Sequence, residues 1–301
     1  MVKRLHLFSA YHAFERFVNR RFHRLGIRLH EVDIDPYHLE YWDSETEKPA
    51  MLLLPAFAPE AKYSWFKQAK VLSRFYRVII PNYIYFGKST SKTDSYHIKD
   101  QAAAIEHLLT RLKIQEISIC GASYGVLIAL ELTAQRTITI QKMVLASPPL
   151  KFSEDHLETF DLGKSGVIHR ADLLVPKSPF FLKKLFDFTH YKKLPIPFFV
   201  FKNLYKNLYI NSAFDKQKLV ETFMEDRADF KNWNYAVNFP VLVLNGEKDK
   251  LVPVEIPQEL QRRLGEKAKL IVMPKTAHMP NYEKPKLYNR ILISFLQGDQ
   301  S

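Results

Sequence analysis

Cysteine is almost absent from this sequence, and long apolar runs are missing. The 301 residues contain one cysteine, Cys120, so no disulfide can form within the chain and no cysteine-rich metal site can exist. No run of roughly 18 apolar residues occurs, and the apolar segment after Met1 is too short for a signal peptide. We therefore expect a cytoplasmic protein without a membrane span.

Glycine is also scarce, with nine residues in 301, less than half of the usual share of about 7%. Each glycine is therefore expected to hold a backbone position that a side chain would not tolerate. The rest of the composition is ordinary, with 47% hydrophobic and 25% charged residues, which excludes collagen-like, low-complexity and wholly disordered chains.

Acids are outnumbered, since 44 lysines and arginines stand against 32 acids, for a net charge of +12. Residues 1–30 hold seven of these cations and only one acid, Glu15, which predicts an anionic partner for this end of the chain. Apolar residues recur there every three or four positions, and arginines step by four on another face, as in a basic amphipathic helix that lies on a membrane. The apolar set is Leu5, Phe8, Tyr11, Phe14, Val18, Phe22 and Leu25, and the basic set is Arg16, Arg20, Arg24 and Arg28. The alternative is a helix that packs its apolar side on the protein body.

From residue 30 onward, short β-rich runs alternate with helical ones, which favours a parallel sheet with helices on both faces. The continuous apolar runs at 51–54 and 241–244 fit this arrangement, because parallel strands are buried on both sides. Strands are expected at 30–35, 38–43, 50–54, 76–80, 116–120, 142–146, 240–244 and 269–273, and helices at 64–74, 98–113, 124–135, 253–264 and 284–296.

Residues 151–235 break this rhythm, because they hold 12 of the 22 phenylalanines and show no strand alternation. We predict three parts: a basic amphipathic helix in residues 1–29, an α/β core in 30–150 and 236–301, and a mostly helical insertion in 151–235. Within the insertion, residues 176–209 combine seven lysines and one acid, Asp187, with many aromatic side chains. This mixture is consistent with an apolar site whose rim faces anionic lipid, or with aromatic residues that only pack inside the insertion.

The clearest chemical motif is Gly121-Ala122-Ser123-Tyr124-Gly125, which follows an expected strand and precedes an expected helix. GxSxG in this context is the nucleophile elbow, where a sharp turn presents the serine and the flanking glycines avoid clashes. A serine hydroxyl needs a histidine to take its proton and a carboxylate to orient that histidine, in the chain order Ser, acid, His.

Two further residues complete this order at the carboxyl ends of later strands, where open α/β sheets place their sites. Asp249 follows the strand at 240–244, and His278 follows the strand at 269–273. Glu247, Glu154 and Asp155 are alternative positions for the acid.

The sequence resembles the α/β-hydrolase superfamily over residues 30–298, and is most similar to esterases and lipases of the monoacylglycerol-lipase kind. The resemblance rests on the elbow, the acid loop at 246–253, the His278 loop with Glu283 and Pro285 following it, and Phe86-Gly87-Lys88-Ser89. It implies a mostly parallel eight-stranded sheet flanked by helices, with a helical cap inserted after the sixth strand. It also implies Ser123 as nucleophile, Asp249 as acid and His278 as base.

The same resemblance implies an oxyanion hole made by the backbone N–H groups of Phe57 and Tyr124. Two positions depart from the family pattern: Pro55-Ala56 replaces the usual His-Gly, and Asn82 stands where an aspartate is frequent. Phe57 keeps a backbone N–H, so the hole can form despite the first departure.

We therefore expect a serine hydrolase that cleaves a carboxylic ester with an apolar acyl portion. Carbon–carbon bond hydrolysis and acyl transfer use the same three residues and stay open, as does a catalytically silent member that binds lipid or protein. A serine at the elbow argues against epoxide-hydrolase chemistry, whose enzymes carry aspartate there. No cofactor or metal is implied. The expected partners are a small ester or lipid and an anionic membrane surface contacted through residues 1–30 and the cap, whereas nucleic acid is not expected.

Overall fold

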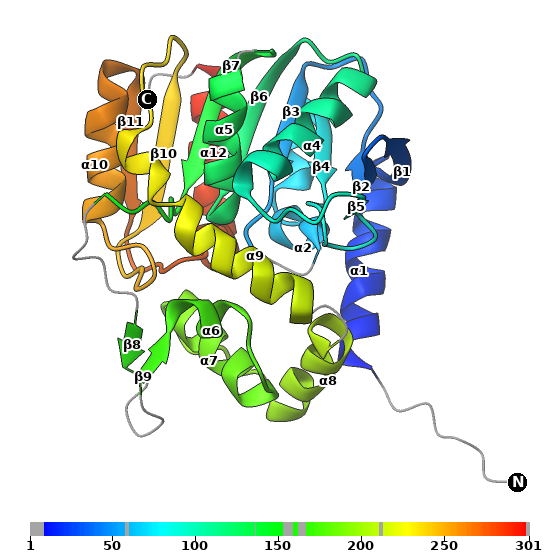
Figure 1. Cartoon of the computed structure of the whole chain (residues 1–301), viewed down its shortest axis with the longest axis vertical. Helices are drawn as coiled ribbons and strands as arrows, with labels where there is room; N and C mark the ends of the chain where they lie inside the picture. The colour runs from blue at the N-terminus through cyan, green and yellow to red at the C-terminus, as the bar shows by residue number, and fades with distance from the viewer. Residues whose placement is uncertain are drawn as a thin grey trace, which may run out of the picture.

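A computed structural model describes residues 9–57, 60–135, 137–152, 159–161, 167–210 and 213–298. Its centre is one large sheet (Figure 1). The strands are β1 (Arg28–Ile34), β2 (Tyr37–Asp43), β3 (Ala50–Leu54), β4 (Arg77–Pro81), β5 (Thr90–Ser91), β6 (Glu116–Ala122), β7 (Thr139–Ala146), β10 (Val241–Gly246) and β11 (Ala268–Met273).

The strand order is β1-β2-β4-β3-β6-β7-β10-β11, with the two-residue β5 paired to β2. The β1–β2 and β2–β4 pairs are antiparallel, and every pair from β4 to β11 is parallel. The expected mostly parallel sheet of eight strands is therefore confirmed, and β5 is a short addition at its antiparallel end.

Alternate residues of the central strands enter two separate hydrophobic cores. On β10, Val241 and Val243 belong to one core, whereas Leu242 and Leu244 belong to the other, and all four are fully buried. This is the period-two consequence of an apolar run in a strand covered on both faces.

Helices cover both faces of the sheet. One core contains side chains of α4 (Ile98–Arg111), α5 (Tyr124–Gln135) and α10 (Glu255–Leu264). The opposite core contains side chains of α1 (Ala10–Arg24), α2 (Ala61–Trp65), α3 (Ala69–Leu72) and α12 (Pro285–Gln297). Two short turns of helix, η4 (Gly265–Lys267) and α11 (Pro280–Glu283), adjoin α10 and α12.

The single helix expected at 64–74 was wrong, because this segment forms α2 and α3 with a turn between them. The turn carries Gln68, which is fully buried and donates from Nε2 to the Asn281 carbonyl (3.1 Å) and to Asn289 Oδ1 (3.0 Å). Lys67 also donates to the Tyr282 carbonyl, at 2.9 Å. Contacts with residues more than 200 positions away therefore decide where the helix breaks, and local periodicity does not report them.

The N-terminal helix is shorter than expected. It begins after Ser9, whose hydroxyl accepts from the His12 backbone N–H, and it ends at Arg24. Arg28 therefore lies on β1 and not on the helix, which corrects the expected four-arginine stripe. Leu5 and Phe8 lie outside the described residues.

The insertion between β7 and β10 lies along one edge of the sheet (Figure 1). Its helices are α6 (Arg170–Leu174), α7 (Pro179–Thr189), α8 (Phe198–Leu208), α9 (Ala213–Asp226) and η3 (Asp229–Asn232). It also contains a short antiparallel pair that the sequence did not indicate, formed by β8 (Thr159–Asp161) and β9 (Val167–His169). Three-residue strands are too short to show a period-two pattern.

Candidate active site

Ser123 occupies the turn between β6 and α5, with a left-handed φ of 48°. Its backbone N–H donates to the Ala146 carbonyl (2.8 Å), which ties the turn to β7. A Cβ on Gly125 would lie 2.5 Å from the Leu54 carbonyl oxygen, so no side chain fits at this position. The sharp turn and the missing side chain are the features that the GxSxG pattern predicts.

The side chain of His278 connects the serine to a carboxylate. Its Nε2 lies 3.0 Å from Ser123 Oγ, and its Nδ1 lies 2.8 Å from Asp249 Oδ2. An ionised carboxylate only accepts, so Nδ1 carries the proton and Nε2 is left to accept from the serine hydroxyl. His278 and Asp249 are both buried, which strengthens these bonds by excluding water.

Backbone donors hold Asp249 in place. Its Oδ1 accepts from the N–H groups of Leu251 and Val252, each at 2.9 Å. The side chain of Asn245 donates to the Val252 carbonyl (3.0 Å) and so fixes the same loop. One carboxylate oxygen is thereby held by the loop, and the other is directed at His278.

The acid loop and the histidine loop touch each other at Gly246. A Cβ on this glycine would lie 2.0 Å from the Ala277 carbonyl oxygen, well inside any contact distance. The histidine loop is also held by the residue that follows β7, because Ser147 Oγ donates to the His278 carbonyl at 3.1 Å. The acid loop and the histidine loop therefore approach so closely at Gly246 that no side chain fits between them.

Of the alternative acids, Glu247 is directed elsewhere: it accepts from the Lys275 backbone N–H at 2.9 Å and forms an ion pair with Lys248. Glu154 and Asp155 lie outside the described residues.

Glu283 holds the histidine loop in a way that sequence reasoning missed. One of its carboxylate oxygens accepts from the Ala277 N–H, and the other accepts from the Tyr191 N–H of the insertion, each at 2.7 Å. Burial raises the pKa of Glu283, while these backbone donors oppose the rise. The sequence showed Glu283 only as part of the family resemblance, and its contact with Tyr191 appears only in the tertiary structure.

Tyr124 directly follows the serine in the sequence, and Phe57 packs against Tyr124. Tyr124 is the first residue of α5, so its N–H has no acceptor within the helix. The Phe57 and Tyr124 rings meet edge to face at 5.6 Å, and Tyr83 steadies the segment before Phe57 by donating from its hydroxyl to the Pro55 carbonyl (2.8 Å). These contacts hold Phe57 against Tyr124, the residue that directly follows Ser123.

The neighbourhood of these two residues is aromatic. Phe86 meets Phe57 edge to face at 5.3 Å, and Phe223 of α9 meets Tyr124 at 5.6 Å. Asn82, the second departure from the family pattern, is buried and accepts from the Ala61 N–H at 2.7 Å while donating to Glu40. Asn82 therefore holds a loop and does not contact the serine.

Among the residues that the structure describes, no group of three or more His, Cys, Asp and Glu side chains is placed to bind a metal ion. Within the same residues, no helix is both long and apolar enough to span a bilayer. Cys120 is fully buried beside Met51, and burial raises the pKa of its thiol.

Comparison with known proteins finds one fold. A family model for the alpha/beta hydrolase fold matches residues 49–175. Epoxide hydrolase 4 of Mus musculus is 24% identical over 298 residues, which cover 91% of this chain and 77% of that protein. The 2-hydroxy-6-oxo-6-phenylhexa-2,4-dienoate hydrolase of Comamonas testosteroni is 23% identical over 280 residues, covering 90% and 95% of the two chains.

Among solved structures, a membrane phospholipase A described as a bacterial virulence factor matches with a TM-score of 0.81 at 22% identity. The match covers 95% of this chain and 90% of that one. The strand order, the insertion after β7 and these matches agree. The chain has the α/β-hydrolase fold.

Proposed function

We propose that this protein is a serine hydrolase that cleaves a carboxylic ester with an apolar acyl portion, like enzymes of the monoacylglycerol-lipase kind. The observation that carries the proposal is the continuous hydrogen-bonded series from Ser123 Oγ through His278 to Asp249, at 3.0 and 2.8 Å. A serine linked in this way to a histidine and a buried carboxylate is the arrangement that makes a hydroxyl nucleophilic.

In the first half of the reaction, Ser123 Oγ attacks the ester carbonyl carbon and His278 Nε2 takes the hydroxyl proton. The negative oxygen of the tetrahedral intermediate accepts hydrogen bonds from the N–H groups of Phe57 and Tyr124. Asp249 stabilises the charged imidazole. The carbon–oxygen bond to the alcohol then breaks, and the alcohol leaves with the proton from His278.

The second half repeats these steps with water. His278 takes a proton from water, the hydroxide attacks the acyl–serine ester, and the intermediate collapses to release the carboxylic acid. The proton on His278 returns to Ser123 Oγ, so the enzyme ends as it began.

The aromatic side chains around Phe57 and Tyr124 support an apolar acyl portion, since Phe86 comes from the core and Phe223 from the insertion. We assign residues 151–235 as a cap that covers the substrate, residues 30–150 and 236–301 as the catalytic core, and residues 1–29 as a separate basic segment. Nucleic acid and cofactors have no part in this proposal.

One other activity has specific support. The Comamonas testosteroni relative is named a dienoate hydrolase, and a meta-cleavage product hydrolase is among the structures with this fold, at a TM-score of 0.77. Carbon–carbon bond hydrolysis is therefore the second candidate for the same three residues.

Hydrolysis of p-nitrophenyl esters with acyl chains of increasing length tests the proposal. We expect turnover with an optimum at a medium or long chain, and loss of turnover in Ser123→Ala. Preference for a 2-hydroxy-6-oxo-dienoate over every ester would favour the second candidate. A wild-type protein that turns over neither class would contradict both activities and leave a silent lipid-binding or protein-binding member of the fold.

A further inference from the structure

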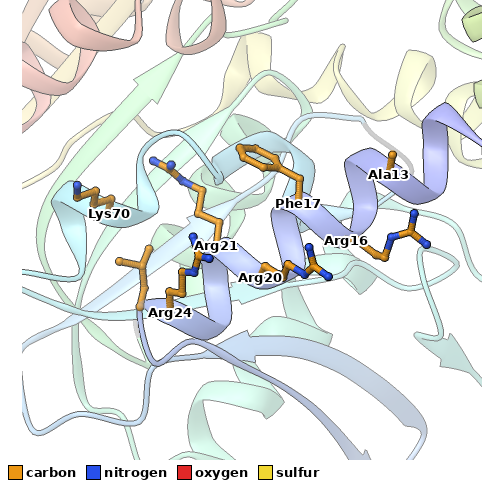
Figure 2. Close-up of a pocket in the computed structure, with 8 residues that line it drawn as sticks. Ala13, Arg16, Phe17, Arg20, Arg21, Arg24 and Lys70 are labelled. Atoms are coloured by element: carbon orange, nitrogen blue, oxygen red, sulfur yellow. The ribbon is translucent and has the colours of Figure 1, made fainter.

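The exposed side of α1 carries a row of arginines. Arg16, Arg20 and Arg24 are spaced by four residues, so they lie on one face of the helix, and each is exposed. A groove with a volume of about 570 Å³ separates α1 from the exposed Lys70 of α3 (Figure 2). Like charges at this spacing repel one another and destabilise a helix, so the row lowers the stability of the folded protein when no partner is bound.

Within the described part of the chain, neither the arginines nor Lys70 forms an ion pair. The only acid of α1, Glu15, is directed to the buried Lys62 at 3.3 Å. Arg21 lines the same groove but donates to the Phe66 carbonyl at 2.8 Å, so it is partly used by the fold.

Two phenylalanines border this row. Phe14 is 36% exposed and Phe17 is 52% exposed. Both contact Phe66 edge to face, at 5.6 and 6.2 Å, so α2 and its neighbouring turn hold them in fixed positions. The four cations together with Phe14 and Phe17 form what we call the α1 basic surface.

Apolar exposure continues from this surface onto the insertion. Of the ten large apolar side chains that are exposed in the described residues, eight belong to α1 or to the insertion. Asn203 of α8 accepts from the Ser9 hydroxyl (3.1 Å) and the Tyr11 N–H (2.9 Å), which joins α8 to the start of α1. Phe199, at 61% exposure, lies one helical turn before Asn203 and hence on the same side of α8.

We propose that the α1 basic surface docks on an anionic phospholipid bilayer, with the cations at the headgroup phosphates and Phe14 and Phe17 at the acyl boundary. Clustered cations attract an anionic leaflet, and apolar rings at the same edge add burial that a soluble anion cannot supply. The surface requires no catalytic residue, so this inference is independent of the proposed function.

The ring geometry favours a bilayer over a nucleic acid. Binding of single-stranded nucleic acid uses exposed aromatic faces, on which bases stack. The face of Phe14 is instead stacked against Tyr63, with ring centroids 5.5 Å apart and planes 22° apart, and Phe14 is also stacked with Phe17 at 6.5 Å. A base could not stack on the face of Phe14 that Tyr63 covers, whereas insertion among acyl chains needs no free face.

Vesicle flotation tests this docking with the full chain. We expect binding to phosphatidylcholine vesicles that contain about one-third phosphatidylglycerol, and none to phosphatidylcholine alone. Each cation near an anionic surface contributes roughly a fivefold factor, so Arg16→Glu/Arg20→Glu/Arg24→Glu should weaken binding at least about 100-fold. Raising the salt from about 0.1 M to about 0.5 M should also weaken wild-type binding.

The matched control is Lys113→Glu/Lys267→Glu/Lys269→Glu, which makes the same change in charge at exposed lysines outside α1 and should keep most of the binding. Both triple variants should hydrolyse a water-soluble short ester as wild type does, which separates docking from catalysis and shows that the variants fold.

Three outcomes would overturn the docking. They are absence of wild-type binding to anionic vesicles, equal loss in the two triple variants, and an affinity for a single-stranded oligonucleotide or for inorganic phosphate that matches the affinity for vesicles.

Discussion

At the scale of single residues, the orientation of His278 depends on Asp249, which accepts from the imidazole Nδ1 and is itself held by two backbone N–H groups. Asp249→Asn keeps the size of the side chain but replaces an acceptor by an amide that can donate to Nδ1. We expect the imidazole to adopt the other tautomer and kcat to fall by on the order of 10³ to 10⁴.

Steady-state kinetics on a soluble ester would measure this effect, and urea unfolding would show that the variant remains folded. Glu247→Gln is the matched control, because this carboxylate is directed to Lys275 and Lys248, and it should retain nearly full activity. Equal losses in the two variants would mean that Asp249 has no special part.

Gly246 is the residue that sets the spacing between the acid loop and the histidine loop. Gly246→Ala would place a methyl group 2.0 Å from the Ala277 carbonyl oxygen, so one loop must move. A shift of about 1 Å at a catalytic group costs on the order of 100-fold in rate, and overpacking costs about 1 to 3 kcal/mol of unfolding free energy. Kinetics and urea unfolding of this variant should show both losses, and wild-type kcat would contradict the assigned role of this contact.

The three residues of the hydrogen-bonded series were predictable from the sequence, whereas their supporting contacts were not. The GxSxG pattern indicated Ser123, and the carboxyl ends of two later strands indicated Asp249 and His278. Both signals are local, because a nucleophilic serine requires a sharp strand-to-helix turn and its partners follow strand ends. Asp249 and Glu247 follow the same strand; the family resemblance favoured Asp249, and only Asp249 contacts His278 among these two. The sequence marked Glu283 only as a residue of the family pattern, and its bond to Tyr191 of the insertion could not be predicted, because that donor is 92 residues away.

At the scale of elements, α4 depends on α9 for its N-terminal cap. His97 precedes α4 without capping it through its side chain, and Asp226 of α9 accepts from the Ile98 N–H at 2.7 Å and contacts His97 Nδ1 at 2.8 Å. A carboxylate at a helix N-terminus satisfies a free donor and opposes the helix dipole.

Asp226→Ala should therefore lower the unfolding free energy by about 1 to 2 kcal/mol, measured by urea denaturation. Amide hydrogen exchange should become faster at the start of α4 and along α9, since this contact joins the insertion to the core. Asp229→Ala, at an exposed acid three residues later, should change stability by less than about 0.5 kcal/mol. Similar effects of the two changes would argue against the capping role.

The bounds of a helix or strand were predictable where neighbouring residues in the sequence determine where the element begins and ends. Helix α5 has the bounds that its apolar pattern and the preceding elbow predicted, 124–135. The expected helix at 64–74 failed because Gln68 bonds to the segment around α11 and α12, and the pair β8–β9 was too short to leave a pattern. The first failure comes from contacts between distant parts of the chain, and the second comes from the shortness of the two strands.

At the scale of the whole molecule, stability should depend on alkaline pH through a buried lysine in the insertion. Lys216 is 3% exposed, and burial lowers its pKa to about 8, whereas an unfolded lysine titrates near 10.4. Between these two pH values the unfolded chain holds the proton and the folded chain does not, so raising the pH favours the folded state.

The unfolding free energy should gain about 2 to 3 kcal/mol from this group between pH 7.5 and pH 10, and none below pH 7. Urea denaturation of wild type and Lys216→Met, compared at both pH values, isolates the contribution. Lys218→Met, at a more exposed lysine of the same helix, should keep the wild-type pH dependence. An identical pH dependence in wild type and Lys216→Met would contradict the burial argument.

The overall architecture was predictable, because a chain in which apolar strands alternate with helices can adopt few arrangements. The observed strand order confirms the expected mostly parallel sheet. Which cations form the α1 basic surface was less predictable. Arg28, expected on the helix, lies on β1, and Lys70 of α3 lines the groove beside the α1 arginines. Only the packing of α1 against α2 and α3 shows which cations share one surface.

The central claim is that Ser123 is a nucleophile activated by His278. Its most direct test is labelling with a fluorophosphonate probe, followed by mass spectrometry of the intact protein and of its peptides. The account predicts one probe per chain, attached at Ser123, with labelling absent in Ser123→Ala and strongly slowed in His278→Ala. A folded wild-type protein that stays unlabelled, or that is labelled at another residue, would contradict it.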